Sequence, residues 1–323
     1  MALNSDKDVF GVAKQAGLGT LAANPTFSFG LAGGGLTVAA NQEADELTGA
    51  YLSPSGAWRD KVEAGYSIET RAWVRSIGLL LYGALGTVST NGSGPYTHTF
   101  VLSQNGTPYL SAFVKKGDGS LHGLRDCRVA ELEFAWEENG PVEVKSSGPG
   151  TVWSVPGSFA PAVAEENSTN YLRPVGGTFK FSPASSTPAD AQILGGSVAI
   201  KREVESWYFS GDIQAADNDA GACEVEARLT LRPTDMGLWK SLLTGSSSGT
   251  SIATTPTYGS FELTFASLSG DTLKLSATRV AFLCDFPGAD PGGGADKVEL
   301  AGLCYRPAVT PITAVLVNSQ QTY

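Results

Sequence analysis

The sequence predicts an all-β protein with short flanking helices, organised as two similar β domains in tandem. The first observation is composition: 39 glycines and only 17% charged residues in 323 are typical of strands and turns. The second is the alternation of apolar and polar residues in several segments, which is the period of a half-buried strand. The third is a repeated helix signal, since "RSIGLLLYGALG" ends at Gly86 and "TDMGLWKSLLTG" ends at Gly245.

The length allows two domains of ordinary size. Residues 1–25 have little periodicity and predict an extended N-terminal arm. We expect a first β domain over 26–155 and a second over 191–307. Between them, 156–190 is rich in Pro, Ser and Gly and predicts a connection with one possible strand at "GGTFKFS". Residues 308–323 form the expected C-terminal tail.

Strand-like sequence in the first half starts at "TFSFGLAGGGLTVAA". It is followed over 41–64 by "NQEADELTGAYLSPSGAWRDKVEA", a long, charged hairpin-like loop. "GYSIETRAWV" then alternates as a half-buried strand does. We expect Ser76 to cap a short helix and Gly86 to end it in the left-handed conformation.

Strands are expected after this helix at "YTHTFVLS", "YLSAFVKK" and "CRVAELEFAWEENGPVEVKSS". In the last of these, Leu132 and Phe134 share one face, while Glu131 and Glu133 share the other. This strand therefore presents acidic side chains outward.

The second half repeats this order. "CEVEARLTL" matches "YSIETRAWV", "YGSFELTFASLSGDTLKLSA" matches the two strands after the helix, and "RVAFLCDF" matches "RVAELEF". The spacings are 159 for Gly78 to Gly237 and Gly86 to Gly245, 162 for Tyr96 to Tyr258, and 151 for Arg128 to Arg279. A shared order of elements with small loop changes favours a duplication.

The net charge excludes a protein that binds nucleic acid through its phosphates. The formal charge is −10 and the pI is near 4.8, so no basic surface is available to hold phosphates. The start "MALNSDKDVFGVAKQ" lacks a secretion pattern, and the longest apolar run, Ile77 to Gly86, is too short to span a bilayer. We therefore expect a protein made in the cytosol that has no membrane partner.

Catalytic and metal motifs are not found. The only histidines, His98 and His122, come without a nucleophile or carboxylate pattern, so we expect no enzyme and no cofactor. "DNDAG" and "DFPGADPGGGAD" could hold Ca²⁺, but solvated turns are the better interpretation. The four cysteines, Cys127, Cys223, Cys284 and Cys304, are expected as core thiols, with a Cys284–Cys304 disulfide as the minor option.

Pairs of carboxylates recur on predicted strand faces opposite the apolar residues: Glu131 and Glu133, Glu203 and Glu205, Glu224 and Glu226. Periodicity alone favours ordinary solvent-exposed faces. If many copies formed a ring, these faces could line a channel with like charge.

The order of these features resembles the major tail tube proteins of long-tailed (siphovirus-type) bacteriophages, in a duplicated-domain form. The resemblance is carried by "FGVAKQAGLGTLA", "NQEADELTGAYLSPSGAWRD", "GYSIETRAWVRSIGLLLYGALG" running into "PYTHTFVLS", and "RVAELEFAWEENGPVEVKSS". It covers residues 8–150 and, through the repeat, 192–307.

The resemblance implies β-sandwich domains of the tail-tube type, whose sheets join around a ring into one β-barrel with an electronegative lumen. Many relatives carry one domain and form hexamers, so a two-domain chain implies a trimer with pseudo-sixfold symmetry. Six domains of four strands give 24 strands, which close into a cylinder about 50 Å across, wide enough for duplex DNA. The implied location is the virion tail, after synthesis in the host bacterial cytoplasm.

The same resemblance implies partners and surfaces. The partners are the protein itself, as trimeric and stacked rings, a tape-measure protein in the lumen, tail terminator and distal tail proteins, and viral DNA that passes without specific binding. The acids expected to face the lumen are Glu131, Glu133, Glu203, Glu205, Glu224 and Glu226. The loop expected to stack rings contains Glu43, Asp45, Glu46, Tyr51, Trp58, Arg59 and Asp60.

The sequence leaves two other functions open. A two-domain carbohydrate-binding or adhesion module would use Trp136, Trp153 or Trp207 as a stacking platform. A hydrolase would use paired carboxylates such as Glu131 and Glu133, but strand carboxylates share a face in most β proteins. We prefer the structural, self-assembling protein.

Overall fold

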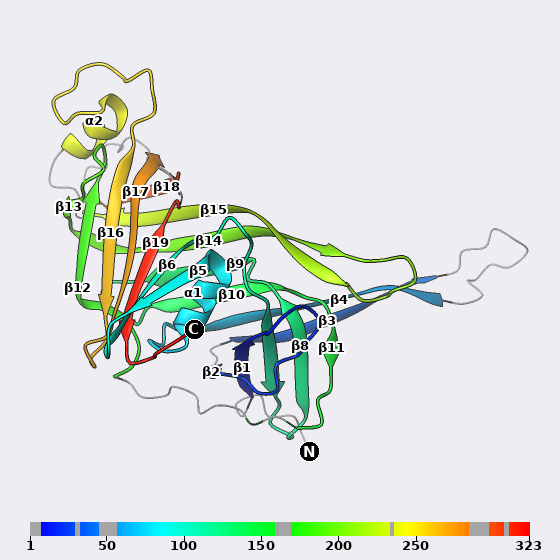
Figure 1. The fold of residues 1–323 in the computed structure, drawn as a ribbon. Coiled ribbons are helices and arrows are strands. Elements are labelled where there is room, and N and C mark those ends of the chain that lie inside the picture. Colours follow the sequence, from blue (N-terminus) through cyan, green and yellow to red (C-terminus); the bar gives the residue numbers. More distant parts are fainter. Residues whose placement is uncertain are drawn as a thin grey trace, which may run out of the picture.

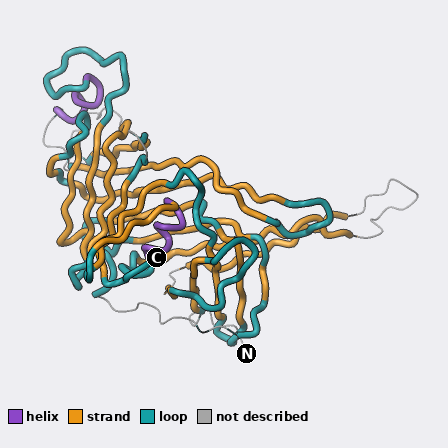
Figure 2. Tube along the Cα trace, viewed as in Figure 1, coloured by secondary structure: helices purple, strands orange, loops and turns teal. Residues whose placement is uncertain are grey.

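The structure is a computed structural model of the chain and describes residues 8–29, 33–44, 57–158, 160, 169–232, 236–283, 297–306 and 310–323. Strands dominate this described part, which also holds two short helices (Figure 2). The strands form two antiparallel sheets, a smaller and a larger one. The predicted all-β class with short helices is confirmed.

The smaller sheet has the order β11-β8-β7-β1-β2. Its strands are β1 Val9–Lys14, β2 Phe27–Phe29, β7 Leu110–Lys115, β8 Leu121–Cys127 and β11 Trp153–Ser154. Strand β1 lies within the segment expected to be an extended arm, yet it pairs with β7 on one side and β2 on the other. The arm prediction is wrong for these residues because Phe10 and Val12 are buried in the core.

The larger sheet has the order β13-β12-β16-β17-β18-β15-β14-β9-β10-β4-β3, and β19, β6 and β5 extend it from β17. Two of its hairpins, β3–β4 and β14–β15, are long and project from the body in the same direction (Figure 1). The bounds are β3 Gly33–Ala44, β4 Ala57–Arg71, β5 Gly86–Asn91, β6 Tyr96–Leu102, β9 Glu131–Trp136, β10 Glu143–Gly150, β12 Arg173–Ser182, β13 Ala189–Asp190, β14 Ile193–Trp207, β15 Asp217–Leu231, β16 Gly259–Ala266, β17 Thr272–Leu283, β18 Val298–Cys304 and β19 Thr313–Asn318.

Each long hairpin is followed by a helix, α1 Ile77–Leu85 and α2 Gly237–Thr244. Both helices end at a left-handed glycine, Gly86 with φ 88° and Gly245 with φ 79°, as the sequence predicts. The predicted cap at Ser76 is wrong, since its backbone is helical and its side chain makes no cap hydrogen bond. Helix α1 is almost entirely buried, whereas α2 buries little besides Trp239.

The same backbone turn occurs in both halves of the chain, between β7 and β8 and between β16 and β17. The four hydrogen bonds are Lys116 N to Ser120 O (2.9 Å), Gly119 N to Lys116 O (2.8 Å), Ser267 N to Asp271 O (2.9 Å) and Gly270 N to Ser267 O (3.2 Å). Both turn glycines have φ 91°. The counterparts of β16 and β17 are therefore β7 and β8.

This correspondence corrects one predicted match. Tyr258 directly precedes β16 and Tyr109 directly precedes β7, so Tyr109 and not Tyr96 is its counterpart. Tyr96 begins β6, which pairs with β5 and β19 and has no equivalent among the described strands after α2.

Both halves contribute to the same sheet. Strand β9 of the first half pairs with β14 of the second over six residues. Strand β12 lies within the expected connection 156–190 and pairs with β16. Strand β19 lies within the expected tail, and it fills the position between β6 and β17 because Ala314, Leu316 and Asn318 alternate into the core.

Candidate functional site

The middle of the larger sheet has one buried face and one exposed face. The buried face carries Leu132 and Phe134 of β9, Val198 and Ile200 of β14 and Val225 of β15, which belong to the same hydrophobic core as the residues of α1. Since successive residues of a strand point to opposite faces, the residues between them lie on the other face.

Four of the predicted acids gather on this exposed face. Lys201 of β14 lies opposite Glu131 of β9 on one side and Glu224 of β15 on the other. The preceding outward residue of β14, Ala199, lies opposite Glu133 and Glu226 in the same way. Side chains from three neighbouring strands therefore form one acidic patch around Lys201. Lys145 of β10 lies opposite Glu133 at the edge of this patch, and Arg228 follows Glu226 along β15.

The remaining two predicted acids, Glu203 and Glu205, lie further along β14 towards the hairpin end. A bulge separates them from the patch, because the register between β14 and β15 shifts between Arg202 and Val204. Both side chains are exposed, and Glu205 lies opposite Asp219. They extend the run of acids along the projecting hairpin.

Two lysines of this face are held by carboxylates, whereas Arg228 of β15 forms no ion pair among the described residues. Lys201 Nζ lies 2.6 Å from Glu226 Oε2, and this hydrogen bond, helped by the charge of Glu131, raises the lysine's pKa. Lys145 Nζ lies 3.2 Å from Glu69 Oε1, and that hydrogen bond raises the pKa of Lys145 in turn. Within the described ranges, Glu131 and Glu133 take part in no ion pair. The patch therefore keeps a surplus of negative charge.

The residues predicted to stack rings fall at the end of β3, at the start of β4 and between these two strands in the sequence. Asp45, Glu46 and Tyr51 lie outside the described residues. Glu43 pairs in register with Trp58. Arg59 and Asp60 are exposed on β4.

The tryptophans of the carbohydrate hypothesis are not gathered into a platform. Trp136 is buried and packs edge-on against Phe265 with ring centroids 5.1 Å apart. Trp153 is half-buried and stacks on His122, while Trp207 is exposed on the β14 hairpin. A buried Trp136 cannot stack on a sugar.

The described residues contain no cluster of three His, Cys, Asp or Glu suited to a metal. In "DNDAG", Asp217 and Asn218 are engaged in hydrogen bonds, and "DFPGADPGGGAD" (285–296) lies outside the described residues. Cys304 is a free, buried thiol, so it forms no disulfide, and burial raises its pKa to about 12.

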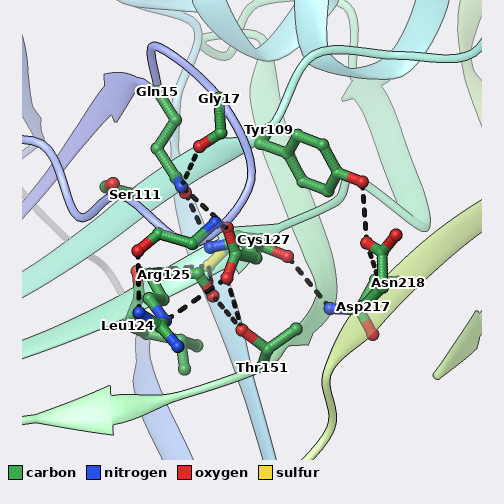
Figure 3. A network of polar contacts seen from close by, with 12 residues as sticks. Gln15, Gly17, Tyr109, Ser111, Leu124, Arg125, Cys127, Thr151, Asp217 and Asn218 are labelled. Carbon is green, nitrogen blue, oxygen red and sulfur yellow. Dashed lines mark hydrogen bonds and ion pairs between the residues drawn. The ribbon is translucent and has the colours of Figure 1, made fainter. Parts of the chain in front are cut away.

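A buried polar network, which the sequence did not indicate, joins the two halves (Figure 3). Its centre is Asp126, which has a left-handed backbone with φ 55°. The Asp126 carboxylate accepts hydrogen bonds from Gln15 Nε2 (2.8 Å) and Thr151 Oγ1 (2.6 Å), and from the N–H of Gly19 (2.7 Å). Its carbonyl accepts one from Asn218 Nδ2 (2.9 Å) on β15.

Beside Asp126, a tyrosine and an arginine hold the same part of β15. The guanidinium of Arg128 lies 3.5 Å from the centre of the Tyr109 ring. Arg128 Nε donates to the carbonyl of Asn218 (3.1 Å), and the Tyr109 hydroxyl donates to Asp217 Oδ1 (2.7 Å). We call Tyr109 and Arg128 the first clamp. No local pattern in the sequence could have indicated a contact between residues so far apart in the chain.

Comparisons with known proteins identify the family of this chain. The family model described as phage tail tube protein matches residues 6–313. No curated protein matches the chain. In the part of the chain that the structure describes, neither helix is long and apolar enough to cross a membrane. Because the family match covers nearly the whole sequence, the chain belongs to the phage tail tube protein family and is a structural component of the virion tail.

Proposed function

We propose that this protein forms rings of three chains with pseudo-sixfold symmetry, and that these rings stack into the tail tube through which DNA is delivered. The observation that carries the proposal is the pairing of β9 with β14 inside one chain. This pairing joins two sets of four strands that have the same order, so it provides a pattern for joining one chain to the next.

The first set runs β3-β4-β10-β9 and the second runs β14-β15-β18-β17. In each set a long hairpin comes first and is followed along the chain by a helix that ends at a left-handed glycine. The last position is taken by β9 in the first set and by the end of β17 in the second. The repeated β7–β8 and β16–β17 turns support a duplicated origin for the two sets.

The edges of the combined eight strands have no partner among the described residues. On β3 the outer edge is unpaired. On β17, pairing with β16 stops at Val280, so 281–283 pair only with β18. An unpaired sheet edge attracts another strand, and closure around a ring removes every such edge.

The two sets also suggest the register of this contact. Leu36 faces Tyr66 as Ile200 faces Val225, so Leu36 corresponds to Ile200. The pairing can be followed from β4 through β10 to β9 in the first set, and from β15 through β18 to β17 in the second. In this register Phe282 of β17 corresponds to Leu132 of β9. Since Ile200 lies opposite Leu132, Leu36 of one copy would lie opposite Phe282 of the next.

Three chains joined in this way give 24 strands and a cylinder about 50 Å across. The acidic face would line the lumen, since the opposite face is buried in the core. Like charge would keep phosphates off the wall, so DNA would pass without being held. A tape-measure protein inside the tube, and terminator and distal tail proteins at its ends, are the partners that this role requires.

Native mass measurement and end-on electron microscopy of the purified chain test the proposal. We expect closed rings of three chains that stack at higher concentration. Rings of six chains would refute the pseudo-sixfold arrangement while preserving a tube. A chain that stays monomeric under all assembly conditions would overturn the proposal.

A further inference from the structure

We propose that Tyr258 and Arg279 form a second clamp, which docks β4 of a neighbouring copy at residues 58–59. This inference rests on the proposed ring and deepens it, because it assigns a specific side-chain contact to the junction between chains.

The second clamp has the construction of the first. The guanidinium of Arg279 lies 4.3 Å from the centre of the Tyr258 ring, as that of Arg128 lies 3.5 Å from Tyr109. In both pairs the tyrosine directly precedes the first strand of a hairpin. Arg128 directly follows the second strand, β8, and Arg279 lies in the second strand, β17, where the register with β16 shifts between Ala277 and Val280. The two arginines are separated by the same 151 residues as the two turn glycines, Gly119 and Gly270.

The two clamps differ in occupancy. The first holds Asp217 and Asn218 of β15, and Arg128 is only 7% exposed. The second has an exposed arginine, and within the described ranges neither its guanidinium nor the Tyr258 hydroxyl makes a hydrogen bond. Tyr258 packs edge-on against Tyr305, which is itself 42% exposed. The second clamp therefore presents the donors of the first without its acceptors.

The segment that fits the second clamp is given by the correspondence of β4 and β15. Each is the second strand of a long hairpin, has 15 residues and leads into a helix. Their buried residues match at a spacing of 159, as Ile68 matches Ala227 and Thr70 matches Leu229. At this spacing Asp217 and Asn218 correspond to Trp58 and Arg59.

The segment must come from a second copy. Within one chain, β4 and β17 are separated in the sheet by β10, β9, β14, β15 and β18. Residues 58–59 lie beside β3 at the far edge, where Arg59 pairs with Gln42. Residues 58–59 therefore cannot reach the second clamp of their own chain, whereas the next chain in a ring would bring its second clamp to this edge.

The chemistry of the contact follows from the first clamp. Arg128 Nε donates to a backbone carbonyl, and that bond does not depend on the side chain of the residue that accepts it. We therefore expect Arg279 Nε to donate to the carbonyl of Arg59 in the neighbouring copy. Trp58 offers no acceptor in place of Asp217, so the role of Tyr258 is to hold the guanidinium through a cation–π contact.

The test uses the full-length chain with Arg279→Ala. Arg232→Ala is the matched control, because Arg232 is also exposed but follows the C-terminal end of β15, away from Asp217 and Asn218 at its start. A hydrogen bond from a charged donor corresponds to about a tenfold change in affinity or more. We therefore expect Arg279→Ala to raise the protein concentration at which half of the chains are in rings by about tenfold or more. The melting temperature of the unassembled chain should stay unchanged. Arg232→Ala should assemble as the wild type does.

A cross-link gives an independent measurement. In a background with the four native cysteines replaced by alanine, Arg59→Cys and Arg279→Cys together should yield covalent dimers and trimers with a short bis-maleimide. Either single variant should yield none. If wild-type rings form but Arg279→Ala assembles normally and no cross-link appears, the clamp is refuted and the ring stands. If the wild type forms no rings, the proposed function itself fails.

Discussion

Asn218 Nδ2 donates a 2.9 Å hydrogen bond to the backbone carbonyl of Asp126, so a fully buried side chain of β15 is tied to the end of β8. Asn218 also accepts a hydrogen bond of 2.6 Å from Ser206 Oγ across the hairpin. One side chain thus secures both the hairpin and the junction between the halves of the chain.

Replacing Asn218 by leucine should therefore destabilise the fold. The carbonyl of Asp126 would lose a buried donor, and an unsatisfied buried polar group costs about 1–3 kcal/mol. Chemical denaturation measures this loss, with Ser246→Ala in an exposed loop as the control. A loss below about 0.5 kcal/mol would mean that water replaces the amide.

The two helix-ending glycines give a matched pair of substitutions. Alanine at Gly245 should cost about 1–2 kcal/mol, because the left-handed backbone is strained but the nearest atom to the new Cβ, Thr257 Oγ1, is 3.7 Å away. At Gly86 the Cβ would lie 2.6 Å from the carbonyl oxygen of Gly106, so backbone must also move. We expect Gly86→Ala to lower the free energy of unfolding more than Gly245→Ala. Equal losses in denaturant titrations would contradict this order.

Alkaline pH should destabilise the fold through the buried thiol of Cys304. Burial raises the pKa of Cys304 to about 12, whereas an unfolded thiol titrates near 8.5. A group whose folded pKa is raised stabilises the fold fully below the unfolded pKa and loses that contribution as pH rises towards the folded one. Above pH 8.5, the free energy of unfolding of the wild type should fall by about 1.4 kcal/mol per pH unit through Cys304. Cys304→Val should not show this part of the decrease. Stability curves that stay parallel for both proteins between pH 8 and 10 would rule out this contribution.

Reversing charge in the acidic patch should make assembled tubes bind DNA. Glu131 and Glu224 both lie opposite Lys201, so changing both to lysine would create a cluster of three cations. We expect tubes of this variant to retain duplex DNA at low salt and to release it as salt rises. Asp190→Lys, on exposed β13, serves as the control. Retention by the control alone would place the patch outside the lumen.

The sequence predicted those elements whose pattern is local. The alternation of Glu131 to Trp136 and the glycines at 86 and 245 specify a strand face and two helix ends without help from distant residues. Strands β1 and β19 are not predicted from the sequence, and β12 is predicted only as a possible strand in the connection, because the place of each in a sheet depends on partners far along the chain. Their small, mixed composition resembles that of linkers and tails.

The acids of the candidate site could be chosen from periodicity, but not their grouping. That Lys201 lies between Glu131 and Glu224 depends on the register of two strand pairs, which no single segment encodes. The first clamp was missed for the same reason, since Tyr109 and Arg128 reach β15 only after the halves meet. Spacing alone pairs Tyr258 with Tyr96, because the correct counterpart, Tyr109, is identified only by the hairpin that follows it.

Strand β19 sits between β6 and β17, and it leaves the ribosome after both of them. Until it arrives, two strands that are already synthesised present bare edges to each other and to any other polypeptide nearby. A chain that ends before residue 313 would keep those edges unpaired and would be prone to aggregation or degradation. Residues 313–318 are therefore needed before either strand has a partner on this side.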